Sequence, residues 1–218
     1  MKRLIIIGEG QTEQAFCKEI LAPYLQEKGI ILQAPTIKHS GGGIVAWHKL
    51  KDQIERHLQN EKDVVVSLFI DYYGIADRHD FPDWKKSKKI AEKNSRLDAI
   101  EEAMASSVSE NLRRRFIPYL QLHEFEALLF CDQSVFRNNF SEDEIADITL
   151  LEDTISRYDC PENINDNPEF TPSTRLKKII KGYNKVIYGS LLAKEIGLEN
   201  MREKCPRFSQ WIQKLETI

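Results

Sequence analysis

Stretches of uninterrupted apolar residues alternate with amphipathic stretches along the first half of the chain. The apolar stretches predict four buried strands, at residues 3–8, 30–39, 63–71 and 115–122. Helices are predicted between them, from a cap at Thr12 to about Lys28 with Gly29 as the stop, over 44–59 and over 95–110. This alternation is typical of right-handed crossovers, so we expect an α/β fold: a Rossmann-like, mainly parallel sheet of about four strands flanked by helices.

The last third of the chain has a different pattern. Residues 134–218 contain no convincing strand and predict several short helices, interrupted by the polar segment "DCPENINDNPEFTPS". We therefore expect an α/β domain over residues 1–133 and a helical C-terminal region over residues 134–218 that packs on it.

Composition narrows the class of protein. Apolar residues make up 41% and charged residues 30% of the 218 positions, which is ordinary for a globular chain with a real core. No stretch approaches the roughly 20 apolar residues of a membrane span, and "MKRLIIIG" is too short for a signal peptide. The four cysteines form no CxxC pair, so we expect a reducing cytoplasm. A net charge of −3 argues against non-specific coating of nucleic acid but permits a local basic groove.

The segment "GEGQTE", residues 8–13, allows two interpretations. A dinucleotide fingerprint needs a third glycine where Glu13 stands, and Glu9 between the two glycines would repel a pyrophosphate. A P-loop fails because no GK[ST] follows. The alternative is a cation site built from Glu9 and Glu13, although Glu13 alone would serve equally well as a capping glutamate.

A third carboxylate points to the same chemistry. Asp71 ends the β-branched strand 63–71, and Glu9 follows the first strand. The carboxyl ends of adjacent parallel strands meet at one edge of a sheet, so we expect Glu9, Glu13 and Asp71 to converge there. Clustered carboxylates repel one another unless a cation lies among them, and Mg²⁺ or Mn²⁺ is the natural choice for oxygen ligands.

The segment "HEFEALLF" adds candidates directly after the fourth strand. It places His123, Glu124 and Glu126 at a further position on the same sheet edge. The two glutamates point in different directions in a strand or a helix, so we expect only one of them to face the site. His123 is a candidate general base or phosphate contact, or an ordinary hydrogen-bonding residue at a strand end.

Basic residues near the predicted site are candidates for binding phosphate. Lys85 and Lys86 lie in the long polar connection 72–93, next to Trp84, which is suited to stacking on a base. The run at 113–115 is most simply a solvated face.

Two further segments supply candidates for substrate binding. Arg175 and Lys185 belong to the C-terminal region and would reach a phosphate from there. "HSGGG" contains His39, Gly41 and Gly42, which form either a backbone nest for an anion or a flexible connector.

An apolar strand ending in "EGxTE", and a later strand ending in Asp with a glycine soon after, resemble the TOPRIM domain of topoisomerases, primases and OLD-family nucleases. Over nearly its full length the chain resembles a bacterial family of small TOPRIM-like proteins of unknown function. The matching stretches are "GEGQTE", "HSGGG", "DYYG", "HEFEALLF", "PSTRL" and "CPRFSQWIQKLE". The resemblance implies a Rossmann-like parallel sheet, magnesium dependence and phosphodiester chemistry on DNA or RNA.

The resemblance also implies roles for individual residues. Glu9 matches the glutamate after the first strand, Asp71 the first aspartate of a DxD pair, and Glu13 a second glutamate found in OLD-type nucleases. Tyr73 stands where the second DxD aspartate is expected. Asp77 or a carboxylate of "HEFE" would have to replace it. Whether the site binds one metal ion or two therefore remains open.

Three functional hypotheses result. The first is a Mg²⁺-dependent nuclease or related phosphodiester-acting enzyme, with Glu9, Asp71 and Glu124 or Glu126 as metal ligands and Glu13 in support. The second is a non-catalytic subunit that binds nucleic acid or a separate ATPase, because proteins that it resembles work beside such an ATPase in bacterial defence against phage. The third is a phosphatase or nucleotidyl hydrolase that acts on a small substrate.

Overall fold

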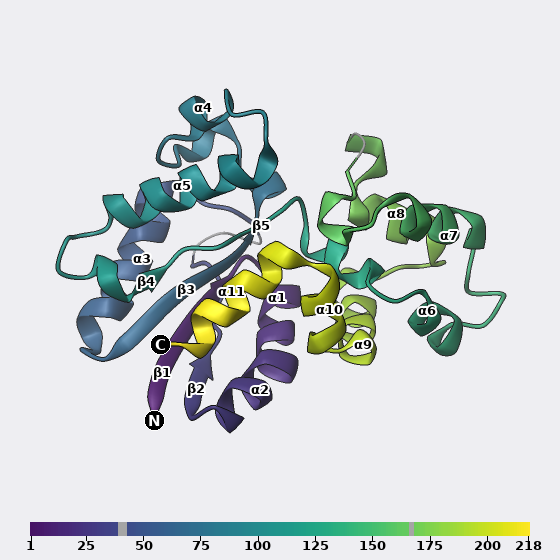
Figure 1. Cartoon of the computed structure of the whole chain (residues 1–218), viewed down its shortest axis with the longest axis horizontal. Helices are drawn as coiled ribbons and strands as arrows, with labels where there is room; N and C mark the ends of the chain where they lie inside the picture. Colours follow the sequence, from purple (N-terminus) through teal and green to yellow (C-terminus); the bar gives the residue numbers. More distant parts are fainter. Residues whose placement is uncertain (39–42, 166–167) are drawn as a thin grey trace. The chain divides into compact units, whose positions relative to one another are not determined.

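A computed structural model describes residues 1–38, 43–165 and 168–218, and the chain in it forms two compact units (Figure 1). Unit 1 comprises residues 1–122 with 213–218, and unit 2 comprises residues 123–212. The boundary therefore lies earlier than the division expected after residue 133. The reason is that the 3₁₀ segment Phe125–Phe130 packs on the helices that follow it in unit 2.

In the described residues, unit 1 contains a parallel sheet of five strands, which confirms the predicted α/β fold. Its strands are β1 (Lys2–Gly8), β2 (Ile30–Gln33), β3 (Val64–Asp71), β4 (Phe116–Ile117) and β5 (Leu120–Gln121). The strand order is β2-β1-β3-β4, and β5 also pairs with β3. Five strands replace the expected four because the predicted strand 115–122 is divided between Ile117 and Leu120 by Pro118, which has no backbone N–H to donate.

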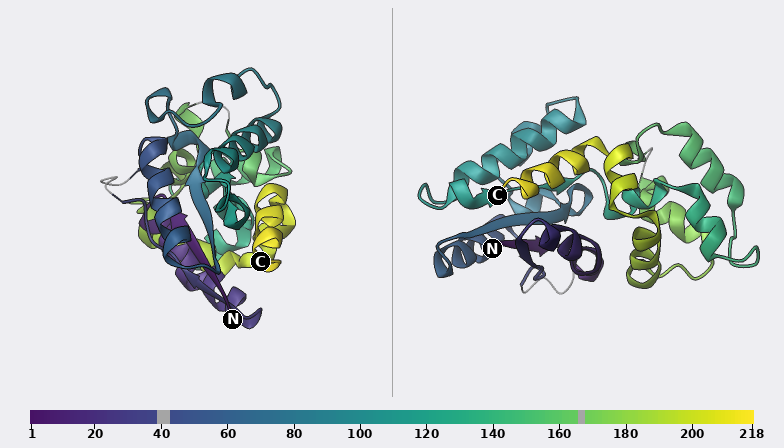
Figure 2. Two further views of the ribbon diagram at one scale, coloured as in Figure 1. Left: turned by 90° about the vertical axis from the view of Figure 1, so that its left-hand side faces the viewer. Right: turned by 60° about the horizontal axis from the view of Figure 1, so that its bottom comes forward.

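Both central strands are buried, as their unbroken apolar sequences predict. Residues of β1 and β3 pack with helices α3 (Trp47–Asn60) and α5 (Lys93–Ser107) in one apolar cluster. Phe69 of β3 contacts Phe16 of helix α1 (Gln11–Phe16) at a ring-centroid distance of 5.7 Å. Figure 2 shows this sheet and its helices from two further sides, with both termini of the chain in unit 1.

The helical segment after β1 carries the "GEGQTE" motif. It consists of α1 (Gln11–Phe16), a π-helical turn (Cys17–Leu21) and α2 (Ala22–Glu27). Gly29 ends the segment as predicted, with a φ of 77° and an N–H that donates to the Gln26 carbonyl. The predicted cap at Thr12 is wrong, because Gly10 holds the cap position and Thr12 is buried inside the first turn.

Unit 2 is built from short helices, as predicted for the C-terminal region. They are α6 (Gln133–Asn139), α7 (Ile148–Arg157), α8 (Pro172–Ile179), α9 (Lys185–Ile196), α10 (Leu198–Lys204) and α11 (Pro206–Glu216), the last of which ends in unit 1. Among the described residues after 133, the one β-type pairing is an isolated bridge between Ile145 and Ile180. Within the described ranges, none of the helices combines the length and apolar character that crossing a membrane requires.

Candidate functional site

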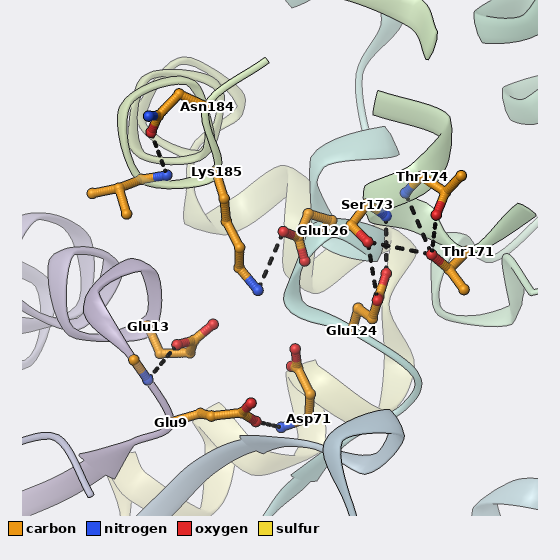
Figure 3. Close-up of polar contacts among 12 residues, drawn as sticks. Glu9, Glu13, Asp71, Glu124, Glu126, Thr171, Ser173, Thr174, Asn184 and Lys185 are labelled. Atoms are coloured by element: carbon orange, nitrogen blue, oxygen red, sulfur yellow. Dashed lines mark hydrogen bonds and ion pairs between the residues drawn. The ribbon is translucent and has the colours of Figure 1, made fainter. Parts of the chain in front are cut away.

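Glu9 and Asp71 lie together at the carboxyl edge of the unit 1 sheet. Strands β1 and β3 are neighbours, and the residue after Gly8 donates its backbone N–H to the Phe69 carbonyl at 3.1 Å. The backbone N–H of Asp71 in turn donates to Glu9 Oε2 at 3.1 Å (Figure 3). A carboxylate oxygen of an aspartate lies within about 5 Å of its own nitrogen, so the two carboxylates lie within about 8 Å of each other. The structure thus brings together two of the predicted site residues.

Glu13 has a capping role beside this edge. Its Oε2 accepts the backbone N–H of Gly10 at 2.8 Å, so a buried carboxylate holds the turn that enters helix α1. Gly10 has no side chain, so this is one half of a capping box. The chain approaches closely here, since a Cβ added to Gly8 would lie 3.1 Å from the Cβ of Glu13. Gly8 thus permits this close approach, and Gly10 donates the N–H that Glu13 accepts.

A third glycine packs directly on Glu9. A Cβ at Gly74 would lie 3.2 Å from each oxygen of the Glu9 carboxylate and 2.9 Å from Cγ1 of Ile44. A larger residue at position 74 would therefore displace the carboxylate or the isoleucine. No local sequence pattern assigns Gly74 a role, although a glycine soon after Asp71 is one of the features that resemble the TOPRIM domain.

The donors in unit 1 suit a magnesium ion that retains water. Within the described part of the chain, no group of three or more Asp, Glu, His or Cys side chains is close enough together to enclose a metal ion. Mg²⁺ is commonly held by one or two carboxylates, with water and substrate phosphates completing its octahedron. Glu9 and Asp71 fit that pattern and do not fit a cage made of protein ligands alone.

In unit 2, Glu124 caps helix α8. Its two carboxylate oxygens accept the backbone N–H of Ser173 at 2.9 Å and the Ser173 hydroxyl at 3.0 Å (Figure 3). Ser173 lies in the first turn of α8, where backbone N–H groups lack helical partners and negative charge is favourable. The contact ties the start of the "HEFEALLF" segment to the "PSTRL" segment.

Glu126 is directed at a different helix. It is completely buried, and its Oε1 lies 3.2 Å from Nζ of Lys185 at the start of α9. Burial raises the pKa of the Glu126 carboxyl, the Lys185 ammonium opposes that rise, and Glu124 adds to it. Burial and then Glu126 also raise the pKa of the Tyr183 hydroxyl. As expected, the two glutamates of this segment point to different places, one to α8 and one to α9.

Residues 8–216 match the family described as Domain of unknown function (DUF4276). The chain belongs to the DUF4276 family. Its match begins at the "GEGQTE" motif and includes every carboxylate described above. Searches of curated proteins and of solved structures found no match to this DUF4276 chain.

His123 opens unit 2 of the DUF4276 chain in an unusual conformation. It is buried, its φ is 67°, and its Nδ1 lies 3.0 Å from Nδ2 of Asn165. The ring and the amide are therefore within hydrogen-bond distance of each other. A left-handed backbone at a buried histidine stores strain that the surrounding packing must support.

The polar connection 72–93 is packed, contrary to the role expected for Trp84. Trp84 is buried, its Nε1 donates to Asp77 Oδ1 at 2.7 Å, and its ring lies 5.4 Å from that of Tyr72. It therefore has no face to offer a base. Asp77 also forms an ion pair with Lys88, and the hydrogen bonds from Lys88 and Trp84 lower the pKa of its carboxyl. These contacts account for Asp77 without a metal ion.

The remaining basic candidates differ in their surroundings. Lys85 is exposed, and Lys86 is exposed and pairs with Asp83 at 3.2 Å. Arg175 is buried in unit 2, where it donates to Thr154 Oγ1 at 2.9 Å and to the Phe170 carbonyl at 3.0 Å. The structure accounts for this arginine without a phosphate. The candidates His39, Gly41 and Gly42 lie outside the described residues.

Proposed function

We propose that this protein is a Mg²⁺- or Mn²⁺-dependent enzyme that hydrolyses phosphodiester bonds in DNA or RNA, a nuclease of TOPRIM type. The observation that supports it is the hydrogen bond from the Asp71 backbone to the Glu9 carboxylate, which joins two acidic residues at adjacent strand ends. Open parallel sheets carry their ligand sites at this edge. The third hypothesis, a small phosphoester as substrate, uses the same residues.

The carboxylates would bind the ion, and each is held in place before the ion arrives. Glu9 is fixed by the Asp71 N–H on one side and by Gly74 on the other. Asp71 is fixed by its position at the end of a buried strand. Such preorganisation lowers the cost of bringing two negative charges to one place. When bound, the ion would supply an activated water and charge stabilisation at the phosphate.

Glu13 would act by positioning. Its bond to the Gly10 N–H fixes the turn that carries Glu9, so the conformation of the loop depends on a residue one helical turn away. Its negative charge would also raise the local attraction for a cation.

A second candidate function is favoured by one observation. Tyr73 stands at the second DxD position, and the described residues contain no close group of three metal-ligating side chains. A chain that has lost its metal chemistry would act as a subunit that binds nucleic acid or a separate ATPase, as proteins that it resembles do in defence against phage.

Cleavage of defined substrates separates the two candidates. Labelled single- and double-stranded DNA and RNA would be incubated with the full chain in Mg²⁺, in Mn²⁺ and in EDTA. Asp63→Asn is a matched control, because Asp63 precedes the same strand that Asp71 ends and is exposed. We expect metal-dependent cleavage by the wild type and Asp63→Asn, reduced at least about 100-fold in Glu9→Gln and Asp71→Asn. Cleavage that persists in EDTA or in both variants contradicts the proposal, and no cleavage of any substrate favours the subunit.

A further inference from the structure

A pocket of about 250 Å³ in unit 1 is lined mainly by charged residues that the proposed chemistry does not use. Its lining consists of Lys38, Lys49, Asp52, Gln53 and Arg56. Three cations thus face one anion, in a chain whose net charge is −3. Such a local excess of positive charge calls for a negative ligand.

The positive charges of these three side chains are accessible to a ligand. Lys38, Lys49 and Arg56 are exposed, and none forms an ion pair with any residue in the described ranges. Their neighbour Lys51 differs, since its Nζ lies 3.8 Å from Glu55 Oε1. The pKa of His57 is lowered by burial first and then by Lys38 and Arg56, so these cations act on a common region.

Gln53 fixes the two elements that carry the cations. Its buried amide accepts the Lys38 N–H at 2.9 Å and donates to the Thr36 carbonyl at 3.1 Å. Lys38 is therefore held against helix α3, which carries Lys49 and Arg56. The pocket is thus built by side chain-to-backbone bonds and is not a chance meeting of long side chains.

The elements that carry the three cations reach the sheet edge where Glu9 and Asp71 lie. The Ile37 N–H donates to the Gly8 carbonyl, so Lys38 lies at the level where β1 ends. Helix α3 starts near that edge, because it connects the end of β2 with the beginning of the parallel strand β3. Lys49 is in its first turn, and Arg56 lies about 10 Å further along the axis.

We propose that Lys38, Lys49 and Arg56 form a track that binds the phosphate backbone of a nucleic acid leading to the carboxylate edge. The choice of a polynucleotide rests on the proposed function. Lys49 and Arg56 lie about 10 Å apart along the axis of α3, a separation that suits two phosphates of one strand better than a single small phosphate. The guanidinium of Arg56 suits bidentate contact with a phosphate, and Asp52 limits where a phosphate can lie.

Charge reversal tests the track in the full chain. Binding of fluorescent oligonucleotides, single- and double-stranded DNA and RNA, would be followed by anisotropy in Ca²⁺ over a series of salt concentrations. Lys49→Glu/Arg56→Glu would be compared with Arg113→Glu/Arg114→Glu, which reverses two exposed arginines elsewhere in unit 1. We expect the first variant to weaken binding at least tenfold and to reduce the salt slope by about 1 to 2, one per lost phosphate contact. Equal binding by both variants, no binding by the wild type, or equally tight binding of polyglutamate would overturn the track.

A small substrate separates failure of the track from failure of the proposed chemistry. Bis(p-nitrophenyl) phosphate carries a single phosphate, which cannot lie on the track and at the carboxylates at once, so its turnover in Mn²⁺ reports on the carboxylates. We expect Lys49→Glu/Arg56→Glu to keep this turnover and Glu9→Gln to lose it. If neither the wild type nor any variant hydrolyses this substrate, and Lys49→Glu/Arg56→Glu alone loses oligonucleotide binding, the track is supported and the enzyme proposal is wrong. If turnover is present and oligonucleotide binding is unchanged, the chemistry stands and the track is wrong.

Discussion

Asp71 holds Glu9 in place through its own backbone, with a hydrogen bond of 3.1 Å from the Asp71 N–H to Glu9 Oε2. Two residues 62 positions apart are thereby joined where neighbouring parallel strands end. The bond orients the Glu9 carboxylate at the edge where Asp71 ends its strand. This pair is the centre of the proposed metal site.

Gly74 should be intolerant of any side chain. In Gly74→Ala the new Cβ would lie 2.9 Å from Cγ1 of Ile44 and 3.2 Å from both Glu9 oxygens, so it would crowd the carboxylate against its neighbours. We expect metal affinity and cleavage to fall by about 10- to 100-fold, the range seen when groups that orient a metal ligand are lost. Isothermal titration calorimetry and the cleavage assay measure both effects.

Gly10→Ala provides the contrast for Gly74→Ala. Its added Cβ would lie at an ordinary 3.4 Å from Glu13 Oε2, and its φ of −148° suits any residue. Gly10→Ala should therefore remain close to the wild type in both assays. Equal effects of the two substitutions would show that Gly74 does not act through Glu9.

Glu124 should contribute to stability through helix α8. Ser173→Ala removes the hydroxyl that donates to Oε1 at 3.0 Å and should lower the free energy of unfolding by about 1 kcal/mol. In Glu124→Gln one of these donors faces an amide NH₂ instead of a carboxylate oxygen. This should lower the free energy of unfolding by about 1–3 kcal/mol. Urea denaturation of both single variants and of the double variant measures the coupling between them.

The same variants test whether Glu124 is also a metal ligand. A purely capping role predicts unchanged metal binding in Glu124→Gln and Ser173→Ala alike. Loss of metal binding in Glu124→Gln alone would assign the carboxylate to the ion. Stability that is unchanged in both variants would contradict the capping role.

Glu162 should make stability depend on pH. It is buried and accepts the backbone N–H groups of Arg207 and Phe208, each at 3.0 Å, but burial dominates and raises its pKa. Above its ordinary pKa of 4.5 the unfolded chain loses this proton while the folded chain keeps it. The folded state then binds more protons, so stability falls as pH rises from 4.5 through the raised pKa.

Glu162→Gln should remove that part of the pH dependence. Urea denaturation over a pH series should show the wild type losing stability relative to the variant across this window. Glu144 supplies a control of opposite sign, because hydrogen bonds from Ser141 lower its pKa. Its contribution is present above pH 4.5 and is lost as the pH falls through the lowered pKa. A wild-type profile parallel to that of Glu162→Gln would contradict the account of Glu162.

The sheet was predictable because its central strands are buried on both faces and therefore apolar throughout. The position of Asp71 beside Glu9 was predictable because neighbouring parallel strands end at the same edge of a sheet. The broken fourth strand had a local signal in Pro118, but how far pairing continues past a proline depends on the neighbouring strand. The cap at Gly10 escaped prediction because Thr12 is the better capping residue by type.

The roles of side chains were harder to predict from the sequence, because their partners lie far away along the chain. Trp84 looked suited to stacking on a base, and only the packing of Tyr72 and Asp77 against it shows otherwise. Glu124 finds its partner 49 residues away at Ser173, at a spacing that no local pattern encodes. Gly74 is required by the carboxylate of Glu9, which no sequence signal connects to it.

Calorimetric titration of Mg²⁺ and Mn²⁺ into the full chain tests the central claim most directly. The wild type would be compared with Glu9→Gln, Asp71→Asn and the control Asp63→Asn. The account predicts that the wild type and Asp63→Asn bind the ion and that each of the other two substitutions abolishes binding. Binding that survives both Glu9→Gln and Asp71→Asn, or a wild type that binds neither ion, would contradict a metal site at this sheet edge.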